Sequence, residues 1–406
     1  MTADIRIPPQ ALYIIETLNQ KGFEAYVVGG CVRDSLLGKT PQDWDITTSA
    51  SPQEVKAIFG RTVDTGIAHG TVTVMRGGEG YEVTTYRIDG EYEDGRHPKS
   101  VVFTTKLAED LRRRDFTINA MAYHHGEGLV DLFHGISDLE ERRICCVGNA
   151  MDRFQEDALR ILRAIRFSAQ LGFDIEPETA AALKALAPNL TRVSKERIQM
   201  ELTKILESPN PGHIKMVFSQ GIAPFLSESF SGIHAETMFI DRELPGLRHL
   251  RWAAFLLHGT PEDAEKILRE LKMDNDTVNA VKLLVRWWKI PAGTDEQTLR
   301  KTMSQMTKEE FDHLLIMKRF TREIPESHEE LDRIGELTCL IRGRGDCVSL
   351  KTMALTGRDL IEMGMKPGRA MGQVLGELFD LVLQYPEMNK REKLEKEAEK
   401  LIKKFT

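Results

Sequence analysis

The sequence predicts an α/β amino-terminal part followed by an entirely helical remainder, and two observations support this prediction. Through residue 150, short β-prone runs alternate with helical patterns. From Asp152 onward, apolar residues recur at the spacing of helices that cover a core. A chain of 406 residues is also too long for one core. We therefore expect four parts, which are residues 1–150, 151–210, 211–330 and 331–406.

The composition excludes several classes of protein. Hydrophobic residues make up 41% and charged residues 29%, as in ordinary globular proteins. No run of about 18 apolar residues occurs, which excludes a membrane-spanning helix, and residues 1–10 lack the pattern of a signal peptide. The five cysteines are scattered and form no C-x-x-C pair. Reduced thiols in the cytoplasm are therefore favoured over a disulfide framework or a zinc site, and no membrane partner is expected.

Positive charge is concentrated locally although the net charge is −7. Net acidity neither proves nor excludes nucleic-acid binding, because such proteins need only one basic face. The segment Lys390–Thr406 holds seven Lys and Arg against four Glu, and a solvated amphipathic helix and an RNA contact explain it equally well. Other basic stretches are Arg112 to Arg114, of which Arg112 and Arg113 are expected to be surface charge, Arg142 with Arg143, and the series Arg160, Arg163 and Arg166.

Local patterns predict the elements of the amino-terminal part. Ala25–Val28 is a β-prone run that leads into two glycines, a helix over Val32–Leu37 follows, and the alternation over Asp43–Thr48 indicates a half-buried strand. The polar segment Asp89–Lys99 has no periodicity, which predicts a mobile loop. Further predictions are a helix capped by Ser51 and ended by Gly60, a hairpin of Thr71–Met75 and Tyr81–Arg87, strands at Val101–Thr104, Leu129–Phe133 and Ile144–Val147, and a helix over Phe154–Leu171.

Asp43 and Asp45 form a candidate metal site. Residues i and i+2 of a strand point to the same side, roughly 6.5 to 7 Å apart, so these carboxylates repel each other unless a cation lies between them. Mg²⁺ suits this arrangement because it prefers oxygen ligands and is usually held by one or two carboxylates together with substrate phosphates. An isolated Asp-x-Asp pair is more often surface charge, and the order and spacing of the neighbouring motifs favour the metal site.

Gly29, Gly30 and Arg33 form a candidate phosphate site just upstream. Glycines that end a strand and open a helix let backbone N–H groups approach a phosphate, although the same pair is often a plain tight turn. Arg33 lies one turn into the predicted helix and can offer a fork of donors to the same phosphates. Metal and phosphate sites this close together predict a nucleoside triphosphate site.

These motifs carry a family resemblance. VVGGCVRDSLLGKTPQDWDITTSASPQEV (residues 27–55) resembles the signature of the class II tRNA nucleotidyltransferase and bacterial poly(A) polymerase family. The resemblance implies a polymerase-beta-like nucleotidyltransferase head of α/β type followed by an all-α neck, body and tail. The further motifs appear in the family's order: RRRDFTINAMA (112–122), LVDLFHGISDL (129–139), EDALRILRAIRF (156–167), RVSKERIQMEL (192–202), and GRDLIEMGMKPGRAMGQVLGEL (357–378) in the tail.

The resemblance implies addition of C, C and A to the 3′ end of tRNA, with release of pyrophosphate. Asp43 and Asp45 would hold two Mg²⁺ ions, and Glu82 is a third carboxylate or simply an exposed strand residue. Asp115 and Asn119 would orient the ribose or cap the backbone. The residues that would bind ATP or CTP are Gly30, Arg33, Arg114, Asp157, Arg160, Arg163 and Arg166.

Asp157 and Arg160 form a candidate template for nucleotide choice. At spacing i,i+3 on one helix they would project together, and Arg donors with Asp acceptors can match the edge of cytosine or adenine. Guanine and uracil would leave groups unpaired, which discriminates strongly. The alternative is an ordinary salt bridge on a solvated helix. Arg163 and Arg166 would face triphosphate or primer phosphates.

Alternatives to complete CCA addition remain open at this point. A poly(A) polymerase shares the head, but such enzymes usually have a longer and more basic carboxyl-terminal region. Within the family the loop at Asp89–Lys99 implies complete addition rather than CC or A alone, although His97 departs from the expected basic residue. A catalytically inactive RNA-binding protein is disfavoured by the intact Asp43 and Asp45. Family members are monomers or dimers, so a homodimer stays open.

Overall fold

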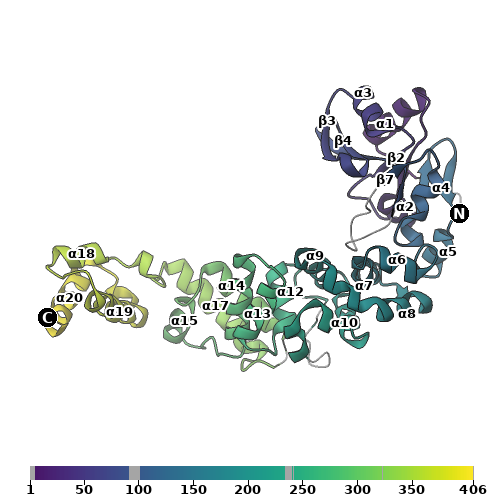
Figure 1. Cartoon of the computed structure of the whole chain (residues 1–406). Coiled ribbons are helices and arrows are strands. Elements are labelled where there is room, and N and C mark those ends of the chain that lie inside the picture. The colour runs from purple at the N-terminus through teal and green to yellow at the C-terminus, as the bar shows by residue number, and fades with distance from the viewer. Residues whose placement is uncertain (1–4, 91–100, 234–239, 241, 322, 406) are drawn as a thin grey trace. The chain divides into compact units, whose positions relative to one another are not determined.

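The structure is a computed structural model that describes residues 5–90, 101–233, 240, 242–321 and 323–405 (Figure 1). The chain forms two compact units. The first comprises Met1–Arg242, Gly246–Phe255 and Lys266–Asn275, and the second comprises Glu243–Pro245, Leu256–Glu265 and Asp276–Thr406. The boundary passes through the predicted body, and the division into four parts stays a prediction.

The predicted α/β head is confirmed as a seven-stranded mixed sheet with the order β3-β4-β5-β2-β1-β8-β9. β1 is antiparallel to β2 and β8, whereas β2 is parallel to β5. β6 and β7 form a separate ribbon, and β10 pairs with β11. The strands are β1 (Ala25–Val28), β2 (Ile46–Thr48), β3 (Thr62–Gly66), β4 (Thr71–Arg76), β5 (Glu79–Thr85), β6 (Arg87–Asp89), β7 (Val101–Phe103), β8 (Met121–His124), β9 (Gly128–Asp131), β10 (Arg143–Ile144) and β11 (Asp174–Ile175).

Short helices cover and connect this sheet. α1 (Pro9–Gln20), which was not predicted, buries Ala11, Ile14, Ile15 and Leu18. α2 (Gly30–Leu36) follows β1, and α3 (Pro52–Ile58) begins with the predicted capping box, in which the Glu54 N–H donates to Ser51 Oγ and the Ser51 N–H donates to Glu54 Oε2. Figure 1 shows α1 and α3 beside β2, β3 and β4. α4 (Leu107–Arg112) and α5 (Gly135–Glu140) complete the head.

The strand predicted over Asp43–Thr48 is shorter than expected. β2 begins at Ile46, and the preceding segment is held to β1 by the Val28 N–H, which donates to the Asp45 carbonyl over 3.0 Å. Burial explains this boundary, because Ile46 is fully buried whereas Asp43 and Asp45 are exposed. The prediction that both carboxylates lie within the strand is therefore wrong, and they precede it at the edge of a cavity.

The helix predicted over Phe154–Leu171 is interrupted. α6 (Ala150–Glu156) ends at Asp157, whose φ of −136° and ψ of 104° are extended, and α7 (Leu159–Leu171) begins two residues later. The carboxylate of Asp157 accepts a hydrogen bond from the Leu159 N–H at the start of α7. Asp157 is thus a capping residue between two helices rather than a residue on a helix face.

Helices make up the rest of both units. The boundary between the units passes through α12 (Arg248–Leu256), α13 (Pro261–Glu270) and α14 (Asn275–Trp287). The second unit has one apolar cluster around Phe311 and Ile334 and another around Leu360 and Val374. The remaining α-helices are α8 (Pro177–Leu186), α9 (Lys195–Leu206), α10 (Lys215–Ser219), α11 (Ala223–Leu226), α15 (Glu296–Met303), α16 (Lys308–Phe320), α17 (His328–Arg344), α18 (Gly357–Glu362), α19 (Arg369–Gln384) and α20 (Arg391–Phe405).

Two predictions, the mobile loop and the absence of a membrane-spanning helix, can be compared only with the residues that the structure describes. Residues 91–99 of the predicted mobile loop lie outside the described residues. Within the described part of the chain, no helix combines the length and the apolar character that crossing a membrane requires.

A buried ion pair predicts how the second unit responds to substitution. Lys318 is fully buried, and its ammonium donates to both oxygens of Glu326 and to the Ile290 carbonyl over 2.8 Å. Lys318→Met should lower the free energy of unfolding by about 3 to 5 kcal/mol, because it leaves an uncompensated buried carboxylate. Urea unfolding followed by tryptophan fluorescence measures the change.

The neighbouring residue supplies the matched control. Arg319 pairs with Asp332 over 2.7 Å, but both side chains are more than half exposed. Arg319→Ala should therefore change the unfolding free energy by less than about 1 kcal/mol. Equal losses in the two variants would contradict the assignment of Lys318 to a buried pair.

Candidate active site

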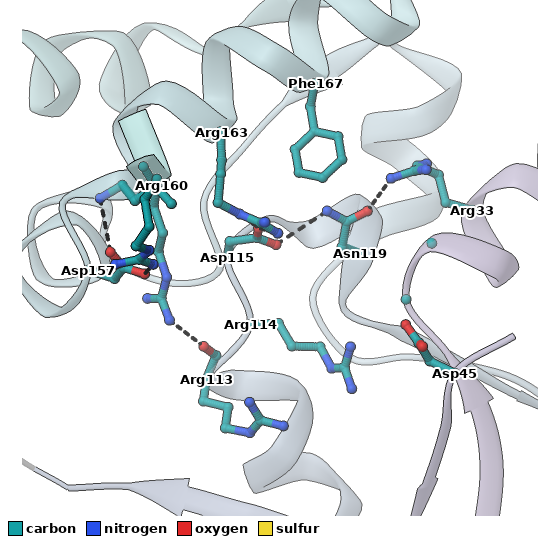
Figure 2. A pocket seen from close by; sticks show the side chains of 14 residues that line it. Arg33, Asp45, Arg113, Arg114, Asp115, Asn119, Asp157, Arg160, Arg163 and Phe167 are labelled. Atoms are coloured by element: carbon teal, nitrogen blue, oxygen red, sulfur yellow. Dashed lines mark hydrogen bonds and ion pairs between the residues drawn. The ribbon is translucent and has the colours of Figure 1, made fainter. Parts of the chain in front are cut away.

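A polar cavity of 450 Å³ lies in the first unit, and Figure 2 shows the side chains that line it. They come from the turn after β1 and the helix α2 that follows it, from the residue before β2, from the segment after α4, from the break between α6 and α7, and from α7 and α9. The lining residues are Gly29, Gly30, Arg33, Asp45, Arg113, Arg114, Asp115, Asn119, Asp157, Leu159, Arg160, Arg163, Phe167 and Arg197. The structure therefore gathers every predicted site residue around this cavity except Asp43 and Arg166.

Asp43 lines a second cavity of 890 Å³, and Asp45 lines both. Glu82 of β5 is exposed on the wall of the second cavity. The parallel pairing of Ile46 with Val83 brings the residues that precede them, Asp45 and Glu82, to the same end of neighbouring strands. Glu82 is therefore the exposed strand residue of one reading, and a role as a third metal carboxylate stays a prediction.

The carboxylates repel one another, as expected of ligands for a cation. Partial desolvation at the cavity wall raises the pKa of Asp45, and the negative charges of Glu82 and Asp43 raise it further, while Arg114 opposes the shift. Among the described residues, no group of three or more His, Cys, Asp or Glu side chains is placed to hold one metal ion. Two carboxylates completed by substrate phosphates are the donor set that fits Mg²⁺.

The glycine turn allows a close approach of side chain and backbone. Gly29 has a φ of 81°, a region that other residues rarely adopt, and its N–H donates to the Met121 carbonyl of β8 over 3.1 Å. A Cβ at this position would lie only 3.1 Å from NH1 of Arg114. The turn therefore requires glycine both for its backbone conformation and for the position of Arg114.

A chain of hydrogen bonds joins the two walls of the cavity. Arg33 of α2 donates from NH1 to Asn119 Oδ1 over 2.7 Å, and Asn119 donates from Nδ2 to Asp115 Oδ1 over 3.3 Å. Asp115 then accepts from Nε of Arg163 over 2.8 Å. The dashed lines of Figure 2 follow the links of Asn119 to Arg33 and Asp115. This chain fixes the orientation of arginines that come from different elements.

Asp115 is ionised within this chain. Burial alone would raise the pKa of Asp115, but the Arg163 guanidinium and the Asn119 amide hold it well below its usual range. The Phe116 N–H also donates to Asp115 Oδ1 over 2.9 Å, but Asp115 does not cap a helix, since the short helix that follows begins after Phe116 and has no side-chain cap. Asn119 lies in a short 3-10 helix, Thr117–Asn119, rather than at the start of an α-helix.

Three guanidinium groups lie around the ring of Phe167. Arg33 and Arg163 lie 5.2 and 5.4 Å from its centroid, and Arg166 lies 4.0 Å from it. These distances are those of cation–π contacts. Phe167 also packs edge-to-face against Phe116. Because the ring face attracts cations, Phe167 lets these positively charged guanidinium groups lie close to one another.

Arg166 does not reach the cavity, in contrast to the prediction that it faces phosphates. Its Nε donates to Glu201 of α9 over 2.6 Å and its NH1 donates to Gln170 over 3.1 Å. Only 8% of Arg166 is exposed. The spacing of three residues from Arg163 turns Arg166 about 60° further around α7, toward α9. We therefore correct its role to that of a packing residue beneath Phe167.

Asp157 and Arg160 both line the cavity, but not from one helix face as the i,i+3 spacing predicted, and the salt bridge of the alternative reading does not form between them. Asp157 accepts from NH2 of Arg197 over 2.8 Å. Arg160 donates to Glu156 Oε2 over 2.7 Å and to the Arg113 carbonyl over 2.9 Å. The break between α6 and α7 explains the difference, because Asp157 does not share a helix face with Arg160.

Sequence reasoning missed several lining residues, among them Phe167, Arg197 and Arg113. Arg197 lies in α9, forty positions after its partner Asp157, and no periodic pattern links the two. Arg113 was taken as surface charge, yet its side chain is only 17% exposed because it pairs with the buried Asp110. The surface reading is right for Arg112, whose side chain is 62% exposed. In a run of three consecutive arginines, nothing in the sequence indicates which side chain is exposed and which lines the cavity.

Comparisons with known proteins agree with this geometry. The sequence model of the Poly A polymerase head domain matches residues 25–145. Models of an RNA-binding segment of polymerase A and of tRNA nucleotidyltransferase domain 2 match residues 172–230 and 248–398. Together the three matches span most of the chain.

Individual relatives are similar over nearly their whole length. The CCA-adding enzyme of Levilactobacillus brevis is 39% identical over 90% of this chain and 91% of its own. That of Leuconostoc citreum is 38% identical over 97% and 96%. The crystal structure of the Bacillus stearothermophilus CCA-adding enzyme in complex with CTP superposes with a TM-score of 0.84 at 30% identity, covering 98% of each chain. The chain therefore belongs to the CCA-adding enzymes, the tRNA nucleotidyltransferases whose head domain resembles that of poly(A) polymerase, and it is an enzyme of this family.

Proposed function

We propose that this protein adds C, C and A in turn to the 3′ end of tRNA, using CTP and ATP and releasing pyrophosphate. The proposal rests on one observation. The glycine turn, Asp45 and the pair Asp157 and Arg160 all line the same cavity. A cavity of 450 Å³ suits one nucleotide at a time. The curated relatives carry the name CCA-adding enzyme, and the solved Bacillus stearothermophilus enzyme was crystallised with CTP.

Asp43 and Asp45 would hold Mg²⁺ together with the substrate phosphates, and Glu82 would complete the negative wall. When bound, such ions activate the attacking 3′ hydroxyl and stabilise the leaving pyrophosphate. Asp45 faces both cavities, so it stands where the primer end and the triphosphate would meet. Desolvation and the negative charges of Glu82 and Asp43 raise the pKa of Asp45, and a bound cation would relieve this repulsion.

The triphosphate would be held by the arginine-rich wall. Arg33 and Arg163 are fixed in orientation by Asn119 and Asp115, so their binding geometry exists before a nucleotide arrives. Arg114 faces the glycine turn, where Gly30 leaves the backbone accessible. Guanidinium groups suit phosphate oxygens because they donate in pairs.

Asp157 and Arg160 would select the base. Each side chain is oriented by a residue outside the pair. Arg197 binds Asp157, and Glu156 binds Arg160. Acceptors on Asp157 match the amino groups of cytosine and adenine, and Arg160 supplies donors for ring or carbonyl acceptors. Buried polar groups of this kind reject a base that leaves them unpaired.

The helical remainder would bind the acceptor and T arms of tRNA, with the Lys- and Arg-containing α20 among the contacts. Contacts to RNA helices are mainly to phosphates and 2′ hydroxyls, so they leave no compact motif in the sequence. The five cysteines are free, which agrees with action in the cytoplasm.

A poly(A) polymerase is the second candidate, because the head matches a model of that description. One assay separates the two. Purified protein with Mg²⁺ is incubated with tRNA that lacks its CCA end, and CTP and ATP are supplied singly and together. We expect two cytidines with CTP alone and one further adenosine with both. A long adenosine tract on any RNA 3′ end would favour the polymerase instead.

Replacing a metal carboxylate should abolish the reaction. Asp43→Ala or Asp45→Ala should lower nucleotide incorporation at least about 10³-fold, because each removes a ligand of the ion that stabilises the transition state. Binding of tRNA, measured by fluorescence anisotropy, should change little. The control is Asp64→Ala, since Asp64 is an exposed carboxylate of β3 paired with Lys56. Turnover by Asp43→Ala near the level of this control would refute the metal role.

Changing the acceptor on Asp157 should loosen nucleotide choice. Asp157→Asn keeps an oxygen for the Leu159 N–H but replaces an acceptor by a donor, and Asp157→Ala removes both. The ratio of CTP to UTP incorporation should fall roughly 10- to 100-fold in both variants, the equivalent of a hydrogen bond to a charged group.

The control for the second test is a helix cap remote from the cavity lining. Asn149 caps α6 by accepting from the N–H groups of Met151 and Asp152. Asn149→Ala should therefore leave the CTP-to-UTP ratio unchanged. Unaltered selectivity in both Asp157 variants would show that the base is chosen elsewhere.

A further inference from the structure

Asp110 is a fully buried carboxylate behind the cavity wall. It lies on α4, and none of its side chain is exposed. Oδ1 accepts from Nε and NH2 of Arg113 over 2.9 and 2.6 Å. Oδ2 accepts from NH2 of Arg114 over 3.1 Å and from the hydroxyl of Thr47 over 3.2 Å. Both oxygens are therefore engaged, and the carboxylate has two cationic partners.

Arg114 lies between Asp110 and the metal carboxylates. Figure 2 shows its side chain extending across the cavity toward Asp45. Its NH1 faces Gly29, and its charge acts on the carboxylate of Asp45. The ion pair that holds it is nevertheless with Asp110. Nε of Arg114 is buried and has no hydrogen-bond partner among the described residues, so the side chain has donors left for another acceptor.

This arrangement sets two acceptors in competition for one guanidinium. Asp45 and Asp43 are exposed carboxylates that repel each other and Glu82, so any nearby cation is attracted to them. An arginine that paired directly with Asp45 would occupy an oxygen that a divalent ion needs. The buried Asp110 is the stronger competitor, because a charge removed from water binds its partner most tightly.

We infer that Asp110 is a positioning residue for the metal site, which holds Arg114 beside Asp45 without letting it pair with Asp45. The inference rests on the proposed function, since it assigns Asp43 and Asp45 to a divalent ion. Arg114 then stays available to the triphosphate at the glycine turn, and Asp45 stays available to the metal. Asp110 touches neither, and it acts through Arg114.

Thr47 ties this arrangement to the sheet. Its hydroxyl lies on β2, two residues after Asp45, and contacts the same oxygen of Asp110 that holds Arg114. Thr47 is fully buried, so the contact is shielded from water. Arg114 is therefore held in place relative to β2, the strand that follows the metal carboxylates, as well as relative to α4.

The test measures metal binding directly. Mn²⁺ replaces Mg²⁺ as the probe, and the free ion is counted by electron paramagnetic resonance during titration of the full-length protein, with and without CTP. Asp110→Asn removes the charge at nearly constant volume. It should raise the half-saturating Mn²⁺ concentration about tenfold, the equivalent of one charge-assisted hydrogen bond that Arg114 makes to Asp45 instead.

Two further variants identify the cause. Arg114→Met should bind Mn²⁺ at least as tightly as the unchanged protein, because it removes the competing cation. In the double variant Asp110→Asn, Arg114→Met, the tenfold loss should disappear, which is a non-additive result that only coupling through Arg114 produces. A loss that persists in the double variant would overturn the inference.

The matched control is another buried carboxylate of the head. Asp138 is 6% exposed and accepts from Thr117 and Arg143, but it does not line the cavity. Asp138→Asn should leave Mn²⁺ binding unchanged, and an equal rise there would overturn the inference. If Asp110→Asn does not fold, Arg114→Met decides alone, since weaker Mn²⁺ binding by that variant would show that Arg114 assists the metal.

The outcomes separate the inference from the proposed function. Mn²⁺ binding to the nucleotide-free protein does not depend on which nucleotide is added or to which RNA. Failure of CCA addition by the unchanged protein would reject the proposed function, whereas the Mn²⁺ series would still decide the role of Asp110. Conversely, normal CCA addition with unchanged Mn²⁺ binding in Asp110→Asn would reject only the inference.

Discussion

The buried carboxylate of Asp115 is the contact on which the cavity depends, because it joins walls that come from separate parts of the chain. One oxygen binds Asn119, which in turn binds Arg33 of α2, and the other binds Arg163 of α7. Without this negative charge, Arg33, Arg163 and Arg166 would surround Phe167 with little to offset their repulsion. A desolvated anion at the centre lets several cations converge on the proposed nucleotide site.

A second set of contacts joins α6 and α7 to the end of α4. The guanidinium of Arg153 donates to the Arg112 carbonyl, and that of Arg160 donates to the Arg113 carbonyl. Carbonyls at the end of a helix have no partner within it and carry partial negative charge, so arginines satisfy them well. The residue proposed to choose the base is thus bonded to the residue next to Arg114, whose side chain extends toward Asp45.

Site residues and elements could be predicted from the sequence where neighbouring residues in the chain determine them. Asp43, Asp45, Gly30 and Arg33 lie within one short stretch, and the turn and helix that hold Gly30 and Arg33 were predicted with small shifts of boundary, although Asp43 and Asp45 precede the strand that was expected to hold them. The role of Arg166 was wrong because regular helical spacing cannot tell which face meets α9. The prediction that Asp157 and Arg160 share one helix face was wrong because the helical spacing was applied across the break between α6 and α7, although both residues line the cavity. Arg197 and Asp110 act through contacts that only the folded chain creates, and the composition of their segments does not distinguish them from surface charges.

The position of Asp157 between α6 and α7 has a consequence for how such an enzyme can evolve. One side chain both accepts a hydrogen bond from the first N–H of α7 and lines the cavity where the base is proposed to bind, so a substitution that changed nucleotide preference would also act on the folding of α7. Asparagine, serine and threonine preserve the helix start to different degrees, whereas apolar residues do not. Mutational routes toward a new preference are therefore narrow, and selection for a folded chain also protects the fidelity of the tRNA end.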